Sequence, residues 1–373
     1  MTVSTIFHYI LSGNCYTADR RNLQQENEQR ILAGGLQSGF MASFKGAQYK
    51  IMINGIVIIH KEAGYTSHDV VAKMRGICGQ KKIGHTGTLD PEAVGVLPVC
   101  LGSATKLCDM LTDREKEYVA ELLLGVETDT QDTTGQILAE HSVTVSEEDV
   151  RRVCAGFIGE YAQIPPMYSA LKVNGKKLYE LARAGKEVER KARPVAIREL
   201  EIIECRLPVV VFRVVCSKGT YVRTLCADIG DKLGCGGTMQ RLTRTRAGGF
   251  RLEDAVTLAQ LQQKKEEGKL SETVLPVDSV FTDCPALHVC EKYLKLLENG
   301  NFIAVEQTEE RMVYPAGEWV RVYGKGAFHG RNEFREGSVF REPEEEFAGI
   351  YTYDTERGCY KPVKMFLPFA SPV

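Results

Sequence analysis

The residue best suited to chemistry in this chain is Asp90, which lies in the segment KKIGHTGTLDPEAVGVLPVCLGSATK, residues 81–106. Pro91 follows it directly, and a residue before proline is held in an extended conformation, away from the helical region. Two glycines bracket His85 and Thr86 and permit a tight backbone approach. The pattern predicts a carboxylate fixed on a rigid loop; the alternative is an ordinary turn or capping aspartate. No glycine-rich phosphate loop is present, so no nucleotide cofactor is expected.

A second segment, CSKGTYVRTLCADIGDKLG, offers a phenol and a cation just after an expected strand. Tyr221 and Arg223 are two residues apart, and in an extended lead-in they would share one face. Arg223 could pair with a carboxylate and keep it ionised. Tyr221 could transfer a proton or stack on a base. The alternative is a surface cation beside a core tyrosine.

The segment EKEYVAELLLGVETDTQDTTG, residues 115–135, contains an aromatic residue and an acidic run. Tyr118 begins an apolar strand, where a core role and a stacking role are both open. The TDTQD run falls short of the spacing of a calcium loop. The sequence therefore predicts no metal site here.

A long basic insertion, residues 164–194, mixes cations with aromatic side chains on an expected loop and short helix. Such a segment suits RNA, because cations contact phosphates and rings stack on unpaired bases. A solvated amphipathic helix is the alternative. The candidate RNA-binding residues are Lys172, Lys176, Lys177 and Arg183.

Length, hydrophobicity, cysteine content and charge indicate a two-domain protein without a membrane-spanning helix and with one basic region. A chain of 373 residues suggests two domains, and no apolar run reaches the roughly 18 residues of a membrane-spanning helix. The 12 cysteines include no C-x-x-C pair, which favours buried thiols in a reducing compartment, so we expect a cytoplasmic protein without a metal. Residues 151–250 hold 19 Lys and Arg against 9 Asp and Glu, a distribution typical of a surface that faces phosphates.

The pattern of elements predicts an α+β fold in three parts. Residues 1–51 are polar, with one short helical candidate at 22–32, and read as a disordered or mis-annotated extension with the true start at Met41 or Met52; a natural flexible arm is the alternative. Residues 52–276 mix strands and helices, with Ser67 as the expected N-cap of a helix. Residues 277–373 return to short β runs and suggest a small β-rich domain. The remaining expected strands are 118–125, 198–204 and 209–217, and the expected helices are 146–157, 176–184 and 221–233.

Taken together, these segments closely resemble the TruB family of tRNA uridine-55 pseudouridine synthases, from about residue 55 to 258. The resemblance is carried by KEAGYTSHDVV, GHTGTLDPEAVGVLPVCLGSATK, TDTQDTTG, IPPMYSALKVNGKKLYELAR, ARPV and CSKGTYVRTLCADIGDKLG, in that order. One departure is Lys61-Glu62-Ala63-Gly64, where the family usually has Lys-Pro-x-Gly.

The resemblance implies a mixed-sheet pseudouridine synthase core, a thumb at residues 164–194 and a C-terminal PUA-like RNA-binding domain. It implies an isomerase that acts on the T-arm of tRNA and needs neither metal nor organic cofactor. Nothing in the sequence suggests more than a monomer. It also implies a role for each matching residue. Asp90 is the catalytic aspartate and Arg223 its partner, His85 helps to displace the T-loop, Tyr118 stacks on the flipped uracil, and Tyr221 and Leu242 line the pocket.

Three alternatives stay open at this point. The chain could be an RNA-binding folding chaperone in which catalysis is secondary, or a related synthase guided by small RNAs. Asp90 could attack C1′ of the ribose or remove a ribose proton.

Overall fold

The computed structural model describes residues 41–44, 47–50, 52–169, 171–173, 175–325 and 345–367. The chain separates into two compact units, residues 1–50 and 51–373. In the first unit β1 (Met41–Phe44) and β2 (Ala47–Lys50) form an antiparallel hairpin. The helix expected at 22–32 lies outside the described residues.

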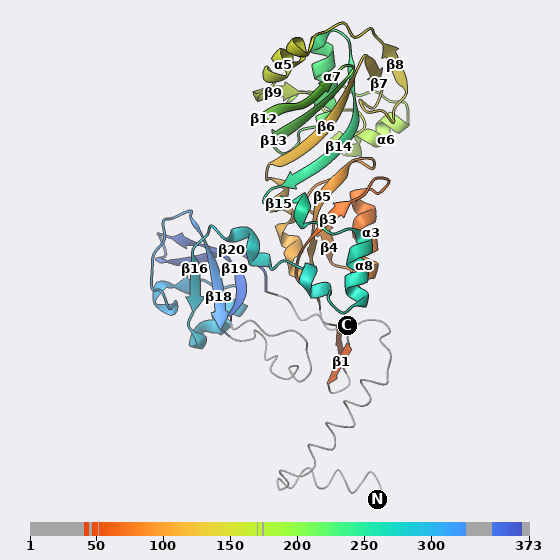
Figure 1. Ribbon diagram of the computed structural model, residues 1–373. Coiled ribbons are helices and arrows are strands. Elements are labelled where there is room, and N and C mark those ends of the chain that lie inside the picture. The colour runs from red at the N-terminus through yellow and green to blue at the C-terminus, as the bar shows by residue number, and fades with distance from the viewer. Residues whose placement is uncertain are drawn as a thin grey trace, which may run out of the picture. The chain divides into compact units, whose positions relative to one another are not determined.

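A mixed nine-stranded sheet organises the second unit (Figure 1). Its strands pair antiparallel with one exception, a parallel junction between β5 and β14 that has two register pairs. This confirms the expected α+β class with a mixed sheet. The main path runs in the order β3 (Gly55–Lys61), β5 (Val94–Leu101), β14 (Gly237–Ala247), β6 (Lys116–Leu124), β13 (Val209–Cys216), β12 (Arg193–Arg206) and β9 (Gly159–Gln163), and β4 (Ile83–His85) and β15 (Phe250–Arg251) pair at its sides.

The β3–β5 end of the sheet is buried on both faces. Val57 and Ile59 of β3 pack in one core with α3 (Ser67–Cys78) and α8 (Leu258–Glu266), while Ile56 and Ile58 pack in a second core on the opposite face. Alternate residues of a strand point to opposite faces, so a continuous apolar run such as GIVII requires cover on both sides.

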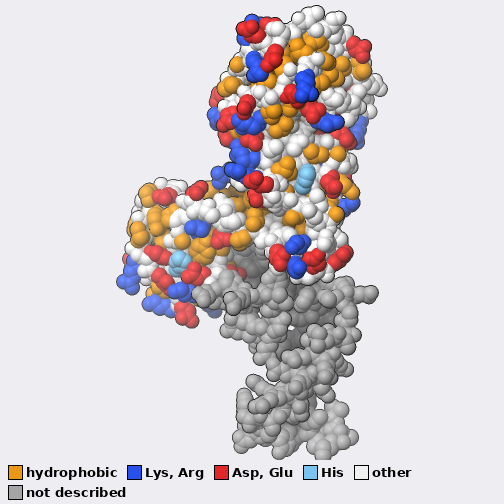
Figure 2. Space-filling view, viewed as in Figure 1, with side chains coloured by type: hydrophobic (Ala, Val, Ile, Leu, Met, Phe, Trp, Pro, Cys, Tyr) orange, Lys and Arg blue, Asp and Glu red, His pale blue; other side chains and the backbone are white. Residues whose placement is uncertain are grey.

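The β12–β13–β6 end is covered on one face. Helices α5 (Glu147–Ala155) and α7 (Val222–Leu233) pack over the apolar residues, and β6 alternates between buried and half-buried positions. On the other face Arg213 forms ion pairs with Glu117, Glu199 and Glu201. Figure 2 shows acidic and basic side chains interspersed on the face it presents, rather than one field of a single sign.

The predicted N-cap of the first helix is wrong by one residue. Thr66 caps α3, because its hydroxyl accepts from the Asp69 N–H while the Asp69 carboxylate accepts from the Thr66 N–H. Ser67 instead uses its Oγ to accept a 2.9 Å hydrogen bond from the N–H of Leu89, next to Asp90. The hydroxyl that looked like a cap therefore fixes the candidate catalytic loop.

The other expected elements are present, with shifted ends. Strand β12 is longer than predicted, at Arg193–Arg206, whereas α5 and α7 are shorter than their predicted ranges at their ends. In the thumb, Lys176 and Lys177 form β11 (Lys176–Lys177), which pairs with β10 (Lys172–Val173), and α6 begins at Leu178 and ends at Arg183. Lys176 and Lys177, expected in the first turn of the helix, instead pair with Lys172 and Val173 in a short antiparallel hairpin.

Smaller elements connect these parts. They are α4 (Cys108–Thr112), the hairpin of β7 (Val126–Thr128) and β8 (Ile137–Glu140), and short 3-10 turns at Gly102–Leu107, Leu252–Asp254, Leu270–Thr273 and Val277–Phe281. No helix among the described ranges is long and apolar enough to cross a bilayer.

The C-terminal residues form a five-stranded sheet with its own apolar core, as the expected β-rich domain requires. Lys106 anchors this sheet to the preceding part, because its Nζ donates to the Met365 carbonyl at 2.7 Å. The proposed boundary between residues 276 and 277 remains a prediction. The strand order is β16 (Ala286–Val289), β18 (Trp319–Lys325), β19 (Glu345–Asp354), β20 (Cys359–Met365) and β17 (Ile303–Ala304), with α9 (Leu294–Glu298) and 3-10 turns at Glu291–Tyr293 and Val305–Gln307 beside it.

Candidate active site

The loop that carries Asp90 connects β4 to β5 and is tied down through its backbone. Lys61, at the end of β3, is fully buried, and its Nζ donates to the carbonyls of Pro91 at 2.9 Å and Ala93 at 2.6 Å. Burial lowers the pKa of Lys61 to about 8, although the nearby carboxylates of Glu92 and Asp90 act in the opposite direction. The Lys61 ammonium group thus satisfies two loop carbonyls that have no partner strand.

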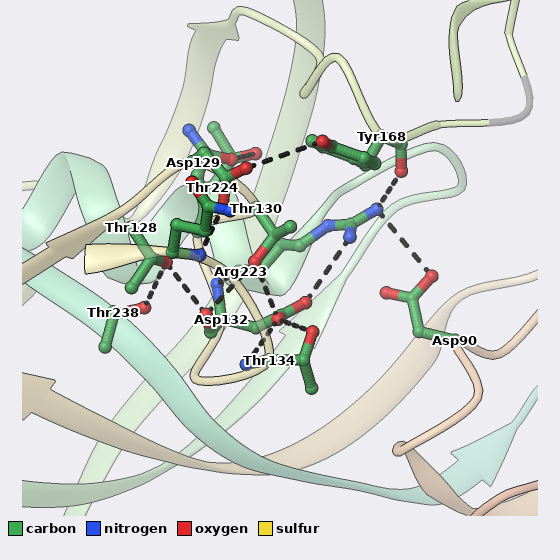
Figure 3. A network of polar contacts seen from close by, with 12 residues as sticks. Asp90, Thr128, Asp129, Thr130, Asp132, Thr134, Tyr168, Arg223, Thr224 and Thr238 are labelled. Atoms are coloured by element: carbon green, nitrogen blue, oxygen red, sulfur yellow. Dashed lines mark hydrogen bonds and ion pairs between the residues drawn. The ribbon is translucent and has the colours of Figure 1, made fainter. Parts of the chain in front are cut away.

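Arg223 is the second residue of α7 and lies between two carboxylates. Its Nη2 is 3.7 Å from Asp90 Oδ1, and its Nη1 is 3.6 Å from Asp132 Oδ2. The Arg223 side chain is 6% exposed, so both interactions are screened little by water. Figure 3 shows the guanidinium reaching from one carboxylate to the other, with the Tyr168 carbonyl on a third side at 2.5 Å from Nη2.

Asp132 is the residue of this network that the sequence analysis missed. Its Oδ1 accepts from the Thr130 hydroxyl at 2.8 Å and from the Thr134 N–H at 3.0 Å. The neighbouring Gln131 has a φ of +65° and accepts from the Thr224 hydroxyl at 2.6 Å. The spacing of the TDTQD run does not fit a cation-binding loop. The threonines around Asp132 are the feature of the sequence that could have indicated a carboxylate fixed by hydrogen bonds.

The electrostatics of Asp90 balance burial against two cations. Desolvation raises the pKa of Asp90 above its ordinary value, and the negative charge of Asp132 raises it further, while Arg223 and Lys61 lower it. The net direction is upward even though 39% of the Asp90 side chain is exposed, because protein surrounds the carboxylate on its remaining sides. Arg223 therefore offsets only part of the cost of ionising Asp90.

Tyr118 and Leu242 lie on the neighbouring strands β6 and β14 and belong to one apolar core. Burial raises the pKa of the Tyr118 hydroxyl, while the neighbouring Arg244 guanidinium lowers it through its charge and a side-chain hydrogen bond; the charge of Asp90 raises it slightly. Leu242 is 8% exposed and pairs with Ala120 across the ladder. Leu242 thus lies on β14, which pairs with the β5 strand that follows the Asp90 loop, and Tyr118 lies on β6, the next strand of the sheet.

Tyr221 precedes α7 in an extended conformation, as predicted, although Arg223 already lies in the helix. The Arg223 guanidinium carbon lies 5.9 Å from the centre of the Tyr221 ring. Gln163, another residue missed from the sequence, fixes the Tyr221 backbone: its Oε1 accepts from the Tyr221 N–H at 2.8 Å, and its Nε2 donates to the Tyr221 carbonyl at 3.0 Å. Gln163 is the last residue of β9, so these two hydrogen bonds lie directly before the thumb in the sequence.

His85 ends β4, and its Nδ1 accepts a 3.3 Å hydrogen bond from the Gly87 N–H. Burial lowers the pKa of His85, and the positive charge of Arg244 lowers it further. His85 is therefore a neutral ring at pH 7, suited to packing and hydrogen bonding rather than to an ion pair with a phosphate.

The thumb cations are separate from the carboxylates. Lys172, Lys176 and Arg183 are exposed, and Lys177 is half-buried with its Nζ 3.2 Å from the Tyr179 hydroxyl. Within the described part of the thumb, no ion pair or hydrogen bond joins these four cations to Asp90 or Arg223. The thumb contacts Arg223 through the backbone carbonyl of Tyr168, which accepts a hydrogen bond from Arg223 Nη2.

The described residues contain no cluster of three or more His, Cys, Asp or Glu side chains arranged to hold a metal ion. The site consists of one carboxylate on a tethered loop, a buried guanidinium shared with a second carboxylate, and aromatic and aliphatic walls. This arrangement can place a charged acid against a bound group while excluding part of the solvent.

Solved structures share this fold. The chain is similar to a protein in the crystal structure of a Cbf5-Nop10-Gar1 complex, with a TM-score of 0.60 and 26% identity over 84% of this chain and 85% of that one. A structure of an archaeal box H/ACA sRNP Nop10-Cbf5 complex matches with a TM-score of 0.58 and 26% identity, covering 84% of this chain and 86% of that one. The fold and the site define a protein of the pseudouridine synthase class.

Sequence comparison gives the family. Residues 75–222 match the TruB family pseudouridylate synthase (N terminal domain), and residues 223–282 match the tRNA pseudouridylate synthase B C-terminal domain. The tRNA pseudouridine synthase B of Alkaliphilus oremlandii is 48% identical, covering 75% of this chain and 94% of that protein. The protein of the same name from Lachnoclostridium phytofermentans is 47% identical, covering 84% of this chain and 100% of that protein. The chain belongs to the TruB family.

Proposed function

We infer that the chain is an isomerase that converts a uridine of tRNA into pseudouridine, and we propose that its target is uridine 55 in the T-arm. The observation that carries the inference is the tethered Asp90 carboxylate beside the buried Arg223, in a chain 48% identical to a tRNA pseudouridine synthase B. The alternative of an RNA-binding chaperone with secondary catalysis is not favoured, because the relatives are named for the synthase.

The reaction needs a base that has left its stack. Isomerisation breaks the N1–C1′ bond, turns the uracil and forms a C5–C1′ bond, and the C5 proton moves to N1, so atoms and electrons balance without a redox partner. Flipping a base costs a few kcal/mol. Stacking on an aromatic ring contributes roughly 1–3 kcal/mol per base, and we assign this contribution to Tyr118 of β6.

Asp90 acts in its ionised form in either chemical route. As a nucleophile it adds to C1′ and leaves again when C5 attacks; as a base it removes a ribose proton and returns it. Arg223 favours the ionised carboxylate, and Asp132 holds Arg223 in place. Burial raises the pKa of Asp90, and the charges of Arg223 and Lys61 act against that shift.

RNA binding is assigned to the thumb and the walls of the site. Lys172, Lys176, Lys177 and Arg183 supply the phosphate contacts, and His85 holds the displaced loop of the RNA. Support comes from the exposure of the thumb cations and from the neutral, half-buried ring of His85. The C-terminal sheet matches the PUA-like domain of this fold and is proposed as a second contact to the tRNA. Action in the cytoplasm as a monomer, without a metal, remains part of the proposal.

The test is to map pseudouridine in an unmodified tRNA transcript after incubation with the purified protein. The expected product is one pseudouridine at position 55, formed without added metal or cofactor. A matched transcript with cytidine at that position should give none. Pseudouridine at other positions only, or no pseudouridine in either transcript, would contradict the proposed target or the proposed activity respectively.

A further inference from the structure

Arg244, which the proposed mechanism does not use, occupies the point where the two ends of the sheet meet. On one side its Cα pairs with Tyr118 of β6, and on the other it pairs in parallel with Gly95 of β5. The junction between β5 and β14 has two register pairs, so few backbone bonds hold the Asp90 side of the sheet to the Tyr118 side. A side chain at this point can join the two.

The side chain of Arg244 makes that connection. Its Nε donates to the Val96 carbonyl at 2.7 Å, and its Nη1 lies 3.5 Å from the Thr88 carbonyl, at the limit of a hydrogen bond. Thr88 and Val96 flank the loop that carries Asp90, so one guanidinium contacts the chain on both sides of the carboxylate. Lys61 contacts the carbonyls of the intervening loop, at Pro91 and Ala93.

The backbone leaves room for this approach at Gly95. This residue has a φ of +110°, and a Cβ built on it would lie 2.2 Å from the Arg244 carbonyl oxygen. Any side chain there would push β14 away from β5. The close approach of Arg244 to the loop is therefore built into the strand as well as into the side chain.

The charge of Arg244 is buried without a described counter-ion. Arg244 is 1% exposed, no carboxylate of the described residues lies within ion-pair distance of it, and its Nη2 has no hydrogen-bond partner among them. Burying an uncompensated cation is costly, and an apolar residue of similar volume is often neutral or stabilising in such a place. The buried charge of Arg244 is therefore expected to cost stability, and its hydrogen bond to the Val96 carbonyl offsets part of that cost.

We propose that Arg244 is a positioning residue for the isomerisation: it holds the Asp90 loop against the strand of Tyr118 and so sets the distance between the carboxylate and the stacked uracil. This inference rests on the proposed function. Arg244 acts through the carbonyls of Thr88 and Val96 and through its contact with the Tyr118 hydroxyl, and it is expected to leave RNA affinity nearly unchanged because its own side chain is buried. A displacement of about 1 Å in such a site costs about 10²-fold in rate.

The experiment compares Arg244→Lys and Arg244→Met with matched changes at Arg246, on the same strand. Arg246 is 31% exposed in its side chain and lies 3.9 Å from Glu117. For each variant, three quantities are measured: the single-turnover rate of pseudouridine formation in a T-arm stem-loop, the Kd for that RNA, and the urea midpoint of unfolding. Hydrogen exchange at the Leu89 and Ala93 amides reports on the loop, because both amides are hydrogen-bonded in the structure.

The expected result is a rate lower by about 10-fold for Arg244→Lys and about 10²-fold for Arg244→Met. The Kd should stay within about threefold, the urea midpoint of Arg244→Met should be equal to or above that of the wild type, and the loop amides should exchange faster. Arg246→Lys and Arg246→Met should leave the rate and the exchange unchanged. Arg244→Lys keeps the charge but cannot contact the Thr88 and Val96 carbonyls at the same time in the way the guanidinium does. If Arg244→Met fails to fold, the rate of Arg244→Lys tests the positioning role.

Three results would overturn the proposal. One is a folded Arg244→Met protein, or Arg244→Lys in its place, whose rate equals that of the wild type. Another is a rate loss that disappears when corrected for the folded fraction, which would mark a purely structural residue. The third is a Kd that rises as much as the rate falls, which would place Arg244 in contact with RNA. If wild-type protein yields no pseudouridine, the proposed function fails, whereas the exchange comparison still shows whether Arg244 orders the loop.

Discussion

The Asp90 loop and the thumb are held in opposite ways. Buried cations tie the loop through its backbone carbonyls, with Lys61 at Pro91 and Ala93 and Arg244 at Val96. Three of the four candidate RNA-binding cations of the thumb, Lys172, Lys176 and Arg183, are exposed, and the fourth, Lys177, is half-buried. From this difference we expect the loop to set the geometry of the proposed chemistry and the thumb to supply affinity for RNA.

The comparison predicts that changes on the loop side affect the rate and leave binding intact. The largest effect is expected for Asp90→Asn, which removes the charge and keeps the shape. The single-turnover rate should fall by about 10⁴-fold or more, the size typical for loss of an essential group. The Kd for the T-arm stem-loop should stay within about threefold. A single-turnover rate lowered by less than about 10²-fold, after exclusion of wild-type contamination, would rule out the assigned role.

Asp132→Asn should lower the rate by about 10²-fold, because Arg223 loses the carboxylate that directs it. The same change should lower the pKa of Asp90, since the charge of Asp132 raises it. The acid limb of the rate profile should therefore move to lower pH while the plateau falls. Both quantities come from single-turnover rates measured across pH. A plateau equal to that of the wild type would show that Arg223 is positioned without Asp132.

On the thumb side, Lys176→Gln with Lys177→Gln should weaken RNA binding by about 10-fold at moderate salt. The slope of log Kd against log salt should decrease by up to about 2, because each lost phosphate contact removes close to one unit. The rate at saturating RNA should be unchanged. Lys264→Gln with Lys265→Gln on α8 removes the same charge elsewhere and serves as the control. Equal effects of the two pairs would mean that only net charge matters.

Asp90 should also reduce the stability of the fold. Its pKa is raised in the folded protein, so the folded state binds the proton more tightly than the unfolded chain does. Stability is therefore lost as pH rises from the ordinary value of 3.8 through the raised pKa. Above that window Asp90→Asn should melt about 1–3 °C higher than the wild type. Calorimetry at several pH values tests this, and a lower melting temperature of the variant at neutral pH would contradict the burial argument.

The smallest effect is expected from deletion of residues 1–51, which precede the strands that build the site. Rate and Kd should both stay within about twofold, since the first loop contact is made by Lys61. The measurement is the same single-turnover assay on the shortened protein. A large loss in either quantity would show that the segment contributes to binding or folding.

Much of the fold followed from local patterns. The strands predicted at residues 118–125 and 209–217 are present as Lys116–Leu124 and Val209–Cys216, because periodicity reports which faces of a strand are covered. The ends were less well predicted. Thr66 rather than Ser67 caps α3, since the reciprocal bond with Asp69 favours the earlier hydroxyl.

The site was predicted in part. Asp90, Arg223 and Tyr221 stand in motifs whose residue types suggested their chemistry, and the structure brings these three together. Asp132 and Gln163 were missed because their importance lies in the residue they hold, which is distant in sequence. Arg223 is 91 residues from Asp132 along the chain and 3.6 Å from it in space.

The sequence by itself determined which side chains are available: a carboxylate on a proline-stiffened loop, a guanidinium after a strand, and a basic insertion. Only the tertiary structure decided which of the arginines in QRLTRTR serves the site. Arg241 and Arg246 keep 76% and 31% of their side chains exposed, whereas Arg244 is 1% exposed. Register shifts in β14, one of them between residues 244 and 246, interrupt the simple alternation of the strand, and the β5–β14 junction buries one arginine beneath the loop.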